Sequence, residues 1–397
     1  MHYGVFIITF ALKLTDMNPF IITGKIPEKY FCDRRNEAGR IIRGVTQGDN
    51  LCLISERRMG KSKLISFCYD KPEISDSHYT FYVDILHTKS FREFTYQFGQ
   101  TVFTQLIPQS RKMLMSLVQG LKSLNAKFGF NAMTGLPEFS LELGDITRPE
   151  YTVEEIFRWL ENADKPCIVA FGEFQQIGKY PENNIEALLR SYIQNLGNVH
   201  FIFAGSERHM ISQMFLSSAR PFYNSASVIE LPPISKNEYI PFVDGLFKEA
   251  DKNILIDDIL KIYDMFEGNT WCMQKTFHEA FAITQEHGTC TLETLRQTID
   301  SILEESGTGY RLMLSGIPTR QKELLYAIAA EWKASKITGV DFIRKYSLAS
   351  SSSVQTAAAS LRKNDLIDTA DGIWYVPDIM LRLYLQRMTN PGRIFLQ

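Results

Sequence analysis

The sequence has little of what would indicate a zinc protein, a disulfide-stabilised protein or a general polyanion binder. Its six cysteines are scattered over 397 residues without a CxxC pair, and its seven histidines show no metal-ligand spacing. This pattern argues against a zinc site and favours a reducing, cytoplasmic compartment. The net charge of −2 predicts no general affinity for nucleic acid, so any such binding would need a local basic surface.

Long hydrophobic runs are also lacking. The apolar run from Val5 to Leu12 is too short to span a bilayer and has no basic segment before it, so we expect neither a membrane span nor a signal peptide. We treat residues 1–17 as an N-terminal extension that is peripheral to function. Hydrophobic residues make up 45% of the chain and charged residues 22%, which predicts two or three well-packed domains.

The strongest motif runs from Ser55 to Ser62 and reads Ser-Glu-Arg-Arg-Met-Gly-Lys-Ser. An apolar run at 51–54 precedes it and predicts a buried strand, and residues 63–68 carry apolar side chains at helical spacing. A strand, a short loop with Gly-Lys-Ser and a helix form the context of a phosphate-binding P-loop. The usual motif opens with glycine, whereas this one opens with Ser55. The alternative interpretation is a basic loop that caps a helix.

Each position of this motif has a chemical role in nucleotide binding. Gly60 allows the backbone to approach a phosphate, Lys61 reaches the β- and γ-phosphates of ATP or ADP, and the Ser62 hydroxyl ligates Mg²⁺. The candidate nucleotide-binding residues of the loop are Arg58, Met59, Gly60, Lys61, Ser62 and Lys63.

An aromatic and charged cluster lies upstream of the P-loop. Phe31 is placed to stack on adenine, and Asp33 or Arg34 to hydrogen-bond it. A solvated turn with a buried phenylalanine explains the same residues equally well.

A second motif follows an apolar strand predicted at 166–171. Gly172-Glu173 stands where a Walker B segment has an aspartate that holds Mg²⁺ and a glutamate that polarises the attacking water. Glu173 can therefore act as general base, while Gly172 predicts slow hydrolysis that Gly172→Asp would accelerate. The alternative is an ordinary core strand followed by a surface glutamate.

Polar residues end two further predicted strands. The strand at 79–85 contains Asp84, either a partner of Mg²⁺ or its water or only a helix cap. The strand at 199–205 leads to Ser206, the candidate sensor of the γ-phosphate. Arg220, before a last strand at 227–231, could reach phosphate or a neighbouring subunit, or form an exposed ion pair.

These three motifs together resemble the archaeal-type predicted ATPases of the STAND class, within the wider AAA-like P-loop proteins. The resemblance covers roughly residues 18–390 and implies an ATPase core, a small helical lid and a C-terminal winged helix. By position it assigns Lys61 and Ser62 to Walker A and Glu173 to Walker B, with Gly172 as a departure from the pattern.

The expected fold is α/β: a P-loop parallel sheet with helices on both faces at 18–233, a helical lid at 234–306 and a winged-helix domain at 307–397. We also expect a helix at 111–127, an exposed hairpin or loop at 128–144, and a helix that begins at Thr152 with a capping box. Gly307 to Gly309 is interpreted as a flexible joint. In the winged helix we expect helices at 319–331, 338–345 and 354–363 and a hairpin at 366–376.

Two classes of function fit these features. One is an ATP-driven switch with slow hydrolysis, and the other is a nucleotide-binding regulator that hardly hydrolyses and acts on DNA or a protein through its winged helix. The predicted recognition helix carries Arg362 and Lys363, a modest basic content. A nucleotide-dependent oligomer fits either class.

Overall fold

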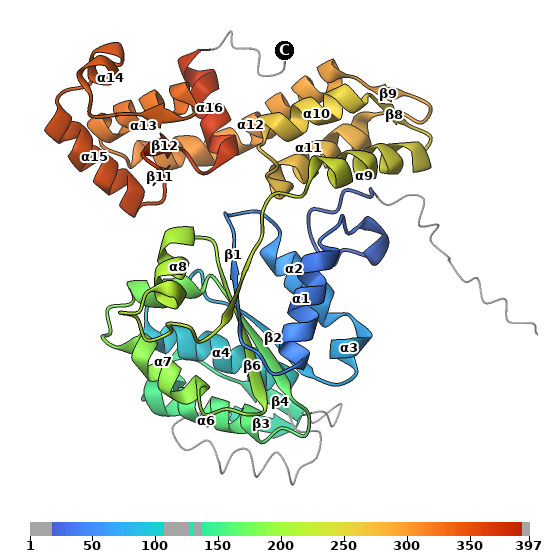
Figure 1. Ribbon diagram of the computed structural model, residues 1–397, viewed down its shortest axis with the longest axis vertical. Helices are drawn as coiled ribbons and strands as arrows, with labels where there is room; N and C mark the ends of the chain where they lie inside the picture. Colours follow the sequence, from blue (N-terminus) through green and yellow to red (C-terminus); the bar gives the residue numbers. More distant parts are fainter. Residues whose placement is uncertain (1–17, 107–126, 131–136, 391–397) are drawn as a thin grey trace, which may run out of the picture. The chain divides into compact units, whose positions relative to one another are not determined.

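The computed structural model describes residues 18–106, 127–130 and 137–390, and it divides into two compact units, 34–232 and the rest of the described chain (Figure 1). The predicted extension 1–17 and nearly all of the predicted helix 111–127 lie outside the described residues. No helix of the described part is long and apolar enough to cross a membrane.

The unit formed by residues 34–232 is built on a parallel sheet of five strands in the order β2-β5-β6-β1-β7. These strands are short apolar runs, and β1 and β5 are buried throughout, as expected for a sheet covered on both faces. Their bounds are β1 Leu51–Ile54, β2 Tyr79–Asp84, β5 Cys167–Gly172, β6 Val199–Gly205 and β7 Ser227–Glu230.

Helices cover both faces of this sheet (Figure 1). On one face, Gly44 of α1 lies so close to Leu51 of β1 that a Cβ there would be 2.8 Å from the leucine side chain. On the other face, phenylalanines from α4 and α6 pack on Phe171 and Phe201. The helices are α1 Arg35–Thr46, α2 Lys61–Tyr69, α3 Pro72–Ser75, α4 Phe91–Gln105, α6 Pro149–Glu161, α7 Ile185–Ile193 and α8 Arg208–Leu216, with 3₁₀ turns η3 Leu143–Asp145 and η4 Phe174–Lys179.

The predicted hairpin at 128–144 and the helix predicted from Thr152 both lie in this unit. Strands β3 Lys127–Phe130 and β4 Pro137–Ser140 pair antiparallel, so the expected hairpin is present. The helix predicted from Thr152 begins earlier, at Pro149, because proline suits the first helical position. Thr152 is therefore buried inside α6, where its hydroxyl donates to the Arg148 carbonyl at 3.0 Å.

The second unit is helical and shares one continuous apolar core. Its helices are α9 Lys236–Glu249, α10 Ile256–Met265, α11 Thr270–Ile283, α12 Leu292–Ser315, α13 Thr319–Glu331, α14 Val340–Lys345, α15 Ser351–Lys363 and α16 Ile379–Thr389. Strands β10 Ala334–Ser335, β12 Ile373–Tyr375 and β11 Asp368–Ala370 form a small sheet beside α13–α15, and β8 Asn253–Ile254 pairs with β9 Thr289–Cys290.

Residues 18–33 pack with this helical unit, although the predicted boundaries group them with the ATPase core. The Phe20 ring is fully buried among Phe247, Phe277 and Phe281, each at a centroid distance of 5.7 Å. This segment also contains the 3₁₀ turn η2 Glu28–Tyr30. The four rings are far apart in the sequence, so no local pattern along the chain connects them.

The flexible joint predicted at Gly307 to Gly309 is wrong, because α12 continues through it to Ser315. A Cβ on Gly307 would be 3.4 Å from the Tyr384 ring of α16 and 3.3 Å from Arg311. Gly307 therefore allows two helices to approach closely. Helix–helix packing keeps α12 intact despite the low helix propensity of glycine.

A second link within this unit joins the α10–α11 turn to the winged helix. Glu267 accepts a hydrogen bond from Trp332 Nε1 at 2.5 Å and pairs with Lys333 and Arg382 at 3.2 and 3.3 Å. The Arg382 guanidinium also lies 3.5 Å over the Trp332 ring. The helical and winged-helix parts are thus packed as one body.

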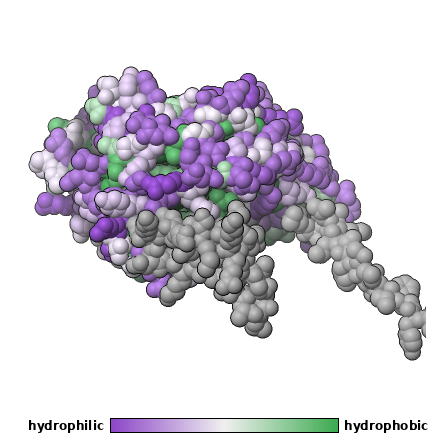
Figure 2. All heavy atoms as spheres, turned by 90° about the horizontal axis from the view of Figure 1, so that it is seen from below, coloured by the Kyte–Doolittle hydropathy of each residue, from purple (hydrophilic) through white to green (hydrophobic). Residues whose placement is uncertain are grey.

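Figure 2 shows one face of the molecule, on which hydrophilic residues predominate and apolar residues form only small groups. Such scattered apolar residues are normal for a solvated surface.

Candidate nucleotide site

The P-loop lies between β1 and α2, as the sequence predicts. Gly60 is the N-cap of α2 with φ of 88°, a left-handed conformation that favours glycine, and the space where its Cβ would stand is open. Arg58 also has positive φ, 64°. Met59 is buried and anchors the loop, while Arg58 and Ser62 are exposed and Lys63 is half-buried. The loop can therefore present backbone and cationic groups to an anion.

Lys61 is buried and folds back on the start of the loop. Its ammonium donates to the Ser55 hydroxyl at 3.0 Å, the Ser55 carbonyl at 3.2 Å and the Glu56 carbonyl at 3.1 Å. Burial lowers the pKa of Lys61 to about 8, against the opposing effect of the Glu173 carboxylate. Ser55, where the usual motif has glycine, thus supplies two of the three oxygens that hold this lysine.

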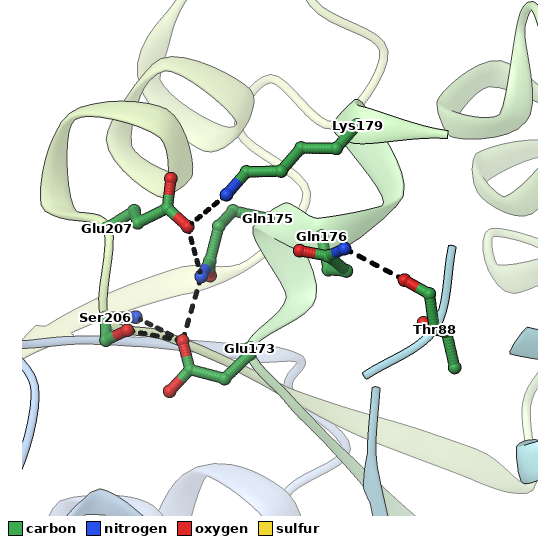
Figure 3. Close-up of polar contacts among 7 residues, drawn as sticks. All are labelled: Thr88, Glu173, Gln175, Gln176, Lys179, Ser206 and Glu207. Carbon is green, nitrogen blue, oxygen red and sulfur yellow. Dashed lines mark hydrogen bonds and ion pairs between the residues drawn. The ribbon is translucent and has the colours of Figure 1, made fainter. Parts of the chain in front are cut away.

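Glu173 and Ser206, predicted as Walker B glutamate and sensor, lie together (Figure 3). The Glu173 carboxylate oxygen Oε2 accepts from the Ser206 amide at 3.0 Å, the Ser206 hydroxyl at 2.5 Å and Gln175 Nε2 at 2.8 Å. Glu173 has φ of 57°, a strained conformation for a non-glycine residue that is maintained by these contacts.

A chain of polar contacts continues from this pair to Lys179 (Figure 3). Gln175 is fully buried, and its Nε2 also lies 3.5 Å from Glu207, which pairs with Lys179 at 2.6 Å. On the other side of η4, Gln176 donates to the Thr88 carbonyl at 2.8 Å. The Glu173 carboxylate is held by Gln175 of η4 and by Ser206, which directly follows β6.

Comparison with known proteins agrees with this geometry. A family model described as a probable winged helix domain matches residues 308–387, and no curated protein matches the sequence. A Walker-type ATPase of Pyrococcus abyssi superposes with a TM-score of 0.61 at 16% identity, over 93% of this chain and 99% of that chain. The chain has the fold of a P-loop ATPase with a C-terminal winged helix.

Two further structures with this fold are complexes with ligands. The Orc2 protein of Aeropyrum pernix, described as ADPNP–ADP complexes, has a TM-score of 0.58 at 12% identity and covers 94% of this chain and 98% of its own. The Orc1 protein of the same organism, in complex with DNA, has a TM-score of 0.50 at 12% identity, over 91% and 93%. The predicted P-loop ATPase fold is thus confirmed, while the STAND assignment stays a prediction.

The residues present do not fit the Mg²⁺ ion that this fold commonly holds. The Ser62 hydroxyl, its predicted ligand, is hydrogen-bonded to the Tyr82 hydroxyl at 2.6 Å. A Cβ on Gly172 would lie 2.5 Å from the same Tyr82 oxygen, so the space of a Walker B aspartate is filled.

This arrangement corrects the expectation that Gly172→Asp would simply restore a missing carboxylate. Tyr82 stands beside Gly172 because β2 and β5 are neighbours, with Tyr82 opposite Ala170 and Asp84 opposite Gly172. Burial raises the pKa of Tyr82 to about 12, so its phenol is neutral at physiological pH.

The remaining candidates have other partners or lie elsewhere. Asp84 accepts from the Leu86 amide at 3.0 Å, which stabilises the turn after β2. Arg220 forms an ion pair with Glu186, the alternative that the sequence left open. Arg34 is buried and donates to Glu37 at 2.9 Å at the start of α1. Phe31 and Asp33 belong to the helical unit, and their contact with adenine stays a prediction.

Sequence reasoning missed Tyr82 and Gln175. Tyr82 lies two residues before Asp84 on a strand, so both side chains point to one face, and this alternation was a usable signal. Gln175 is two residues after Glu173 and polar, but only the fold shows that it is buried and aimed back at the carboxylate.

Proposed function

We propose that this chain binds ATP and ADP at its P-loop and acts as a nucleotide-dependent switch with slow hydrolysis. The observation that carries the proposal is the buried Lys61 ammonium at the head of α2, with the Glu173–Ser206 pair at the same edge of the sheet. A buried cation whose partners are neutral oxygens favours an anionic ligand. Nucleotide phosphates supply that charge at a helix N-terminus.

The switch element in this proposal is the P-loop itself. Lys61 cannot hold a phosphate and keep its three hydrogen bonds to Ser55 and Glu56, since an ammonium has three donors. Phosphate binding would release the start of the loop, and nucleotide loss would restore the contacts. Hydrogen exchange of residues 55–60 would report this exchange of partners.

Slow hydrolysis follows from the same geometry. One oxygen of Glu173 already accepts three hydrogen bonds, which lowers its availability as a base for water. Gly172 provides no carboxylate, so the site lacks an anionic anchor that phosphoryl transfer commonly uses. We therefore expect turnover below about 1 s⁻¹, the low end of typical enzymes.

Calorimetric titration of ATP and ADP into the full chain tests the site. Lys61→Ala removes a charge-assisted hydrogen bond worth about 1.5–3 kcal/mol, which predicts an affinity loss of about 10- to 150-fold. Lys165→Ala is the matched control, because Lys165 precedes β5 at the opposite end of the sheet and donates to the Asp76 carbonyl. Equal affinity of wild type and Lys61→Ala would contradict the assignment, and turnover well above 1 s⁻¹ would contradict slow hydrolysis.

A further inference from the structure

Tyr82 joins the two positions on which a P-loop site commonly depends for its divalent cation. Its hydroxyl lies 2.6 Å from Ser62 Oγ and 2.5 Å from where a Cβ of residue 172 would stand. The Tyr82 hydroxyl is therefore hydrogen-bonded to Ser62, the predicted Mg²⁺ ligand. The same neutral oxygen also fills the space in which a carboxylate at position 172 would stand.

Two described acids beside this corner, Asp84 and Glu173, each direct a carboxylate oxygen to a donor of the protein. Asp84 lies opposite Gly172 in the strand register, but its carboxylate accepts from the Leu86 amide. Glu173 directs one carboxylate oxygen to Ser206 and Gln175. A hard cation such as Mg²⁺ binds through carboxylates and phosphate oxygens in a strict octahedral shell. The side chains around Ser62 and Gly172 therefore provide few suitable ligands for it.

The loop offers another source of positive charge for a polyphosphate. The eight residues 56–63 contain four cationic side chains, Arg57, Arg58, Lys61 and Lys63, and a single acid, Glu56. Arginine and lysine donors near a helix N-terminus neutralise phosphate oxygens directly. These side chains can thus neutralise the phosphate charge that a metal ion neutralises in other P-loop sites.

We infer that Tyr82 takes the place of the Walker B carboxylate and that the P-loop therefore binds nucleoside di- and triphosphates without help from a divalent cation. This inference rests on the proposed function, because it concerns the same nucleotide site. It assigns Tyr82 a positioning role: the phenol holds the Ser62 hydroxyl and occupies the space beside Gly172 where a carboxylate would bind the cation.

The test compares ADP affinity of the full-length wild type in excess magnesium chloride and in EDTA, by calorimetry. We expect the two dissociation constants to agree within about threefold. A larger tightening by Mg²⁺ overturns the inference but leaves the proposed function intact. Lack of ADP and ATP binding in both buffers overturns the proposed function and this inference with it.

A designed variant tests the role of Tyr82 itself. Gly172→Asp combined with Tyr82→Leu supplies the carboxylate and removes the ring that fills its space, and should make ADP binding at least about tenfold tighter in Mg²⁺ than in EDTA. Tyr79→Leu is the control, since Tyr79 starts the same strand and bonds Asp164 far from the P-loop. A double variant that folds and keeps the wild-type ratio refutes the role of Tyr82, and the wild-type comparison stands whether or not the double variant folds.

Discussion

Gly172 and Gly205 end neighbouring strands and are glycine for a steric reason. A Cβ on Gly172 would meet the Tyr82 hydroxyl, and a Cβ on Gly205 would lie 2.6 Å from Gln175 Oε1 and 2.9 Å from Ile211. Neither residue needs a left-handed backbone, since neither has positive φ. Both glycines make room for a polar side chain that then contacts Ser62 or Glu173. The departure from the Walker B pattern is thus linked to an added tyrosine contact.

The pKa of Lys61 predicts how nucleotide affinity depends on pH. Burial lowers this pKa to about 8, with Glu173, Arg57 and Glu56 as charged neighbours. Phosphate binding requires the ammonium, so affinity should be constant below pH 8 and fall above it, by at most about tenfold per pH unit. Calorimetry of ADP binding from pH 7 to pH 9.5 measures this slope.

Lys61→Arg is the control for this pH profile, because arginine does not lose its proton in this range. Its affinity should be flat where that of the wild type falls. A flat wild-type profile would show that Lys61 stays charged without nucleotide. The sign for folding is opposite: since the pKa is depressed below 10.5, the free energy of unfolding should rise from about pH 8 to pH 10.5.

At the scale of elements, α12 determines how the helical unit is built. It runs unbroken from Leu292 to Ser315 and packs on α16 at Gly307. Its first half belongs to the predicted lid and its second half to the predicted winged helix, so the two parts share a helix as well as a core. This packing disfavours an independent hinge between the predicted lid and the predicted winged helix.

Phe20 tests whether residues 18–33 are part of that unit. Phe20→Ala removes a fully buried ring from a cluster of three others and should cost about 3–5 kcal/mol of unfolding free energy. Denaturant unfolding with hydrogen-exchange mapping should place the loss in α9 and α11, with the sheet unit unchanged.

Phe67→Ala on α2 gives the comparison, because its half-buried ring belongs to the other unit. Its effect should be smaller and confined to 34–232. If Phe20→Ala left the exchange of α9 and α11 unaltered, the grouping of 18–33 with the helical unit would be refuted.

The elements predicted well are those with local signals. The apolar run before the P-loop predicted β1, and the turn at Asp371-Gly372 predicted the hairpin of β11 and β12. The candidate site was predicted less completely, since the partners of Glu173 and Ser62 depend on strand order and register. The alternation along β2 places Tyr82 on the same face as Asp84, but the contact of Tyr82 with Ser62 depends on how β2 packs beside the P-loop. The Gly307 joint failed because tertiary packing outweighed propensity.

At the scale of the whole molecule, the winged helix raises the question of DNA. Its helix α15 exposes Gln355, Thr356, Arg362 and Lys363, but Arg362 pairs with Asp368 at 3.3 Å. With a net charge of −2, little attraction to phosphates remains. We expect the full chain to bind duplex DNA more weakly than about 1 μM at physiological salt, as measured by fluorescence anisotropy. A salt-dependent affinity below that value would refute this expectation.

The grouping of residues 18–33 with a unit that resumes at residue 233 has a consequence during synthesis. Phe20 leaves the ribosome about 260 residues before Phe281, its last aromatic neighbour, which at about 5–20 residues per second is a delay of roughly 13–52 s. The sheet unit is complete in the meantime and can fold first. The apolar segment around Phe20 is therefore synthesised well before the helices that bury it, and a chaperone that shields it during this interval would raise the yield of native chains.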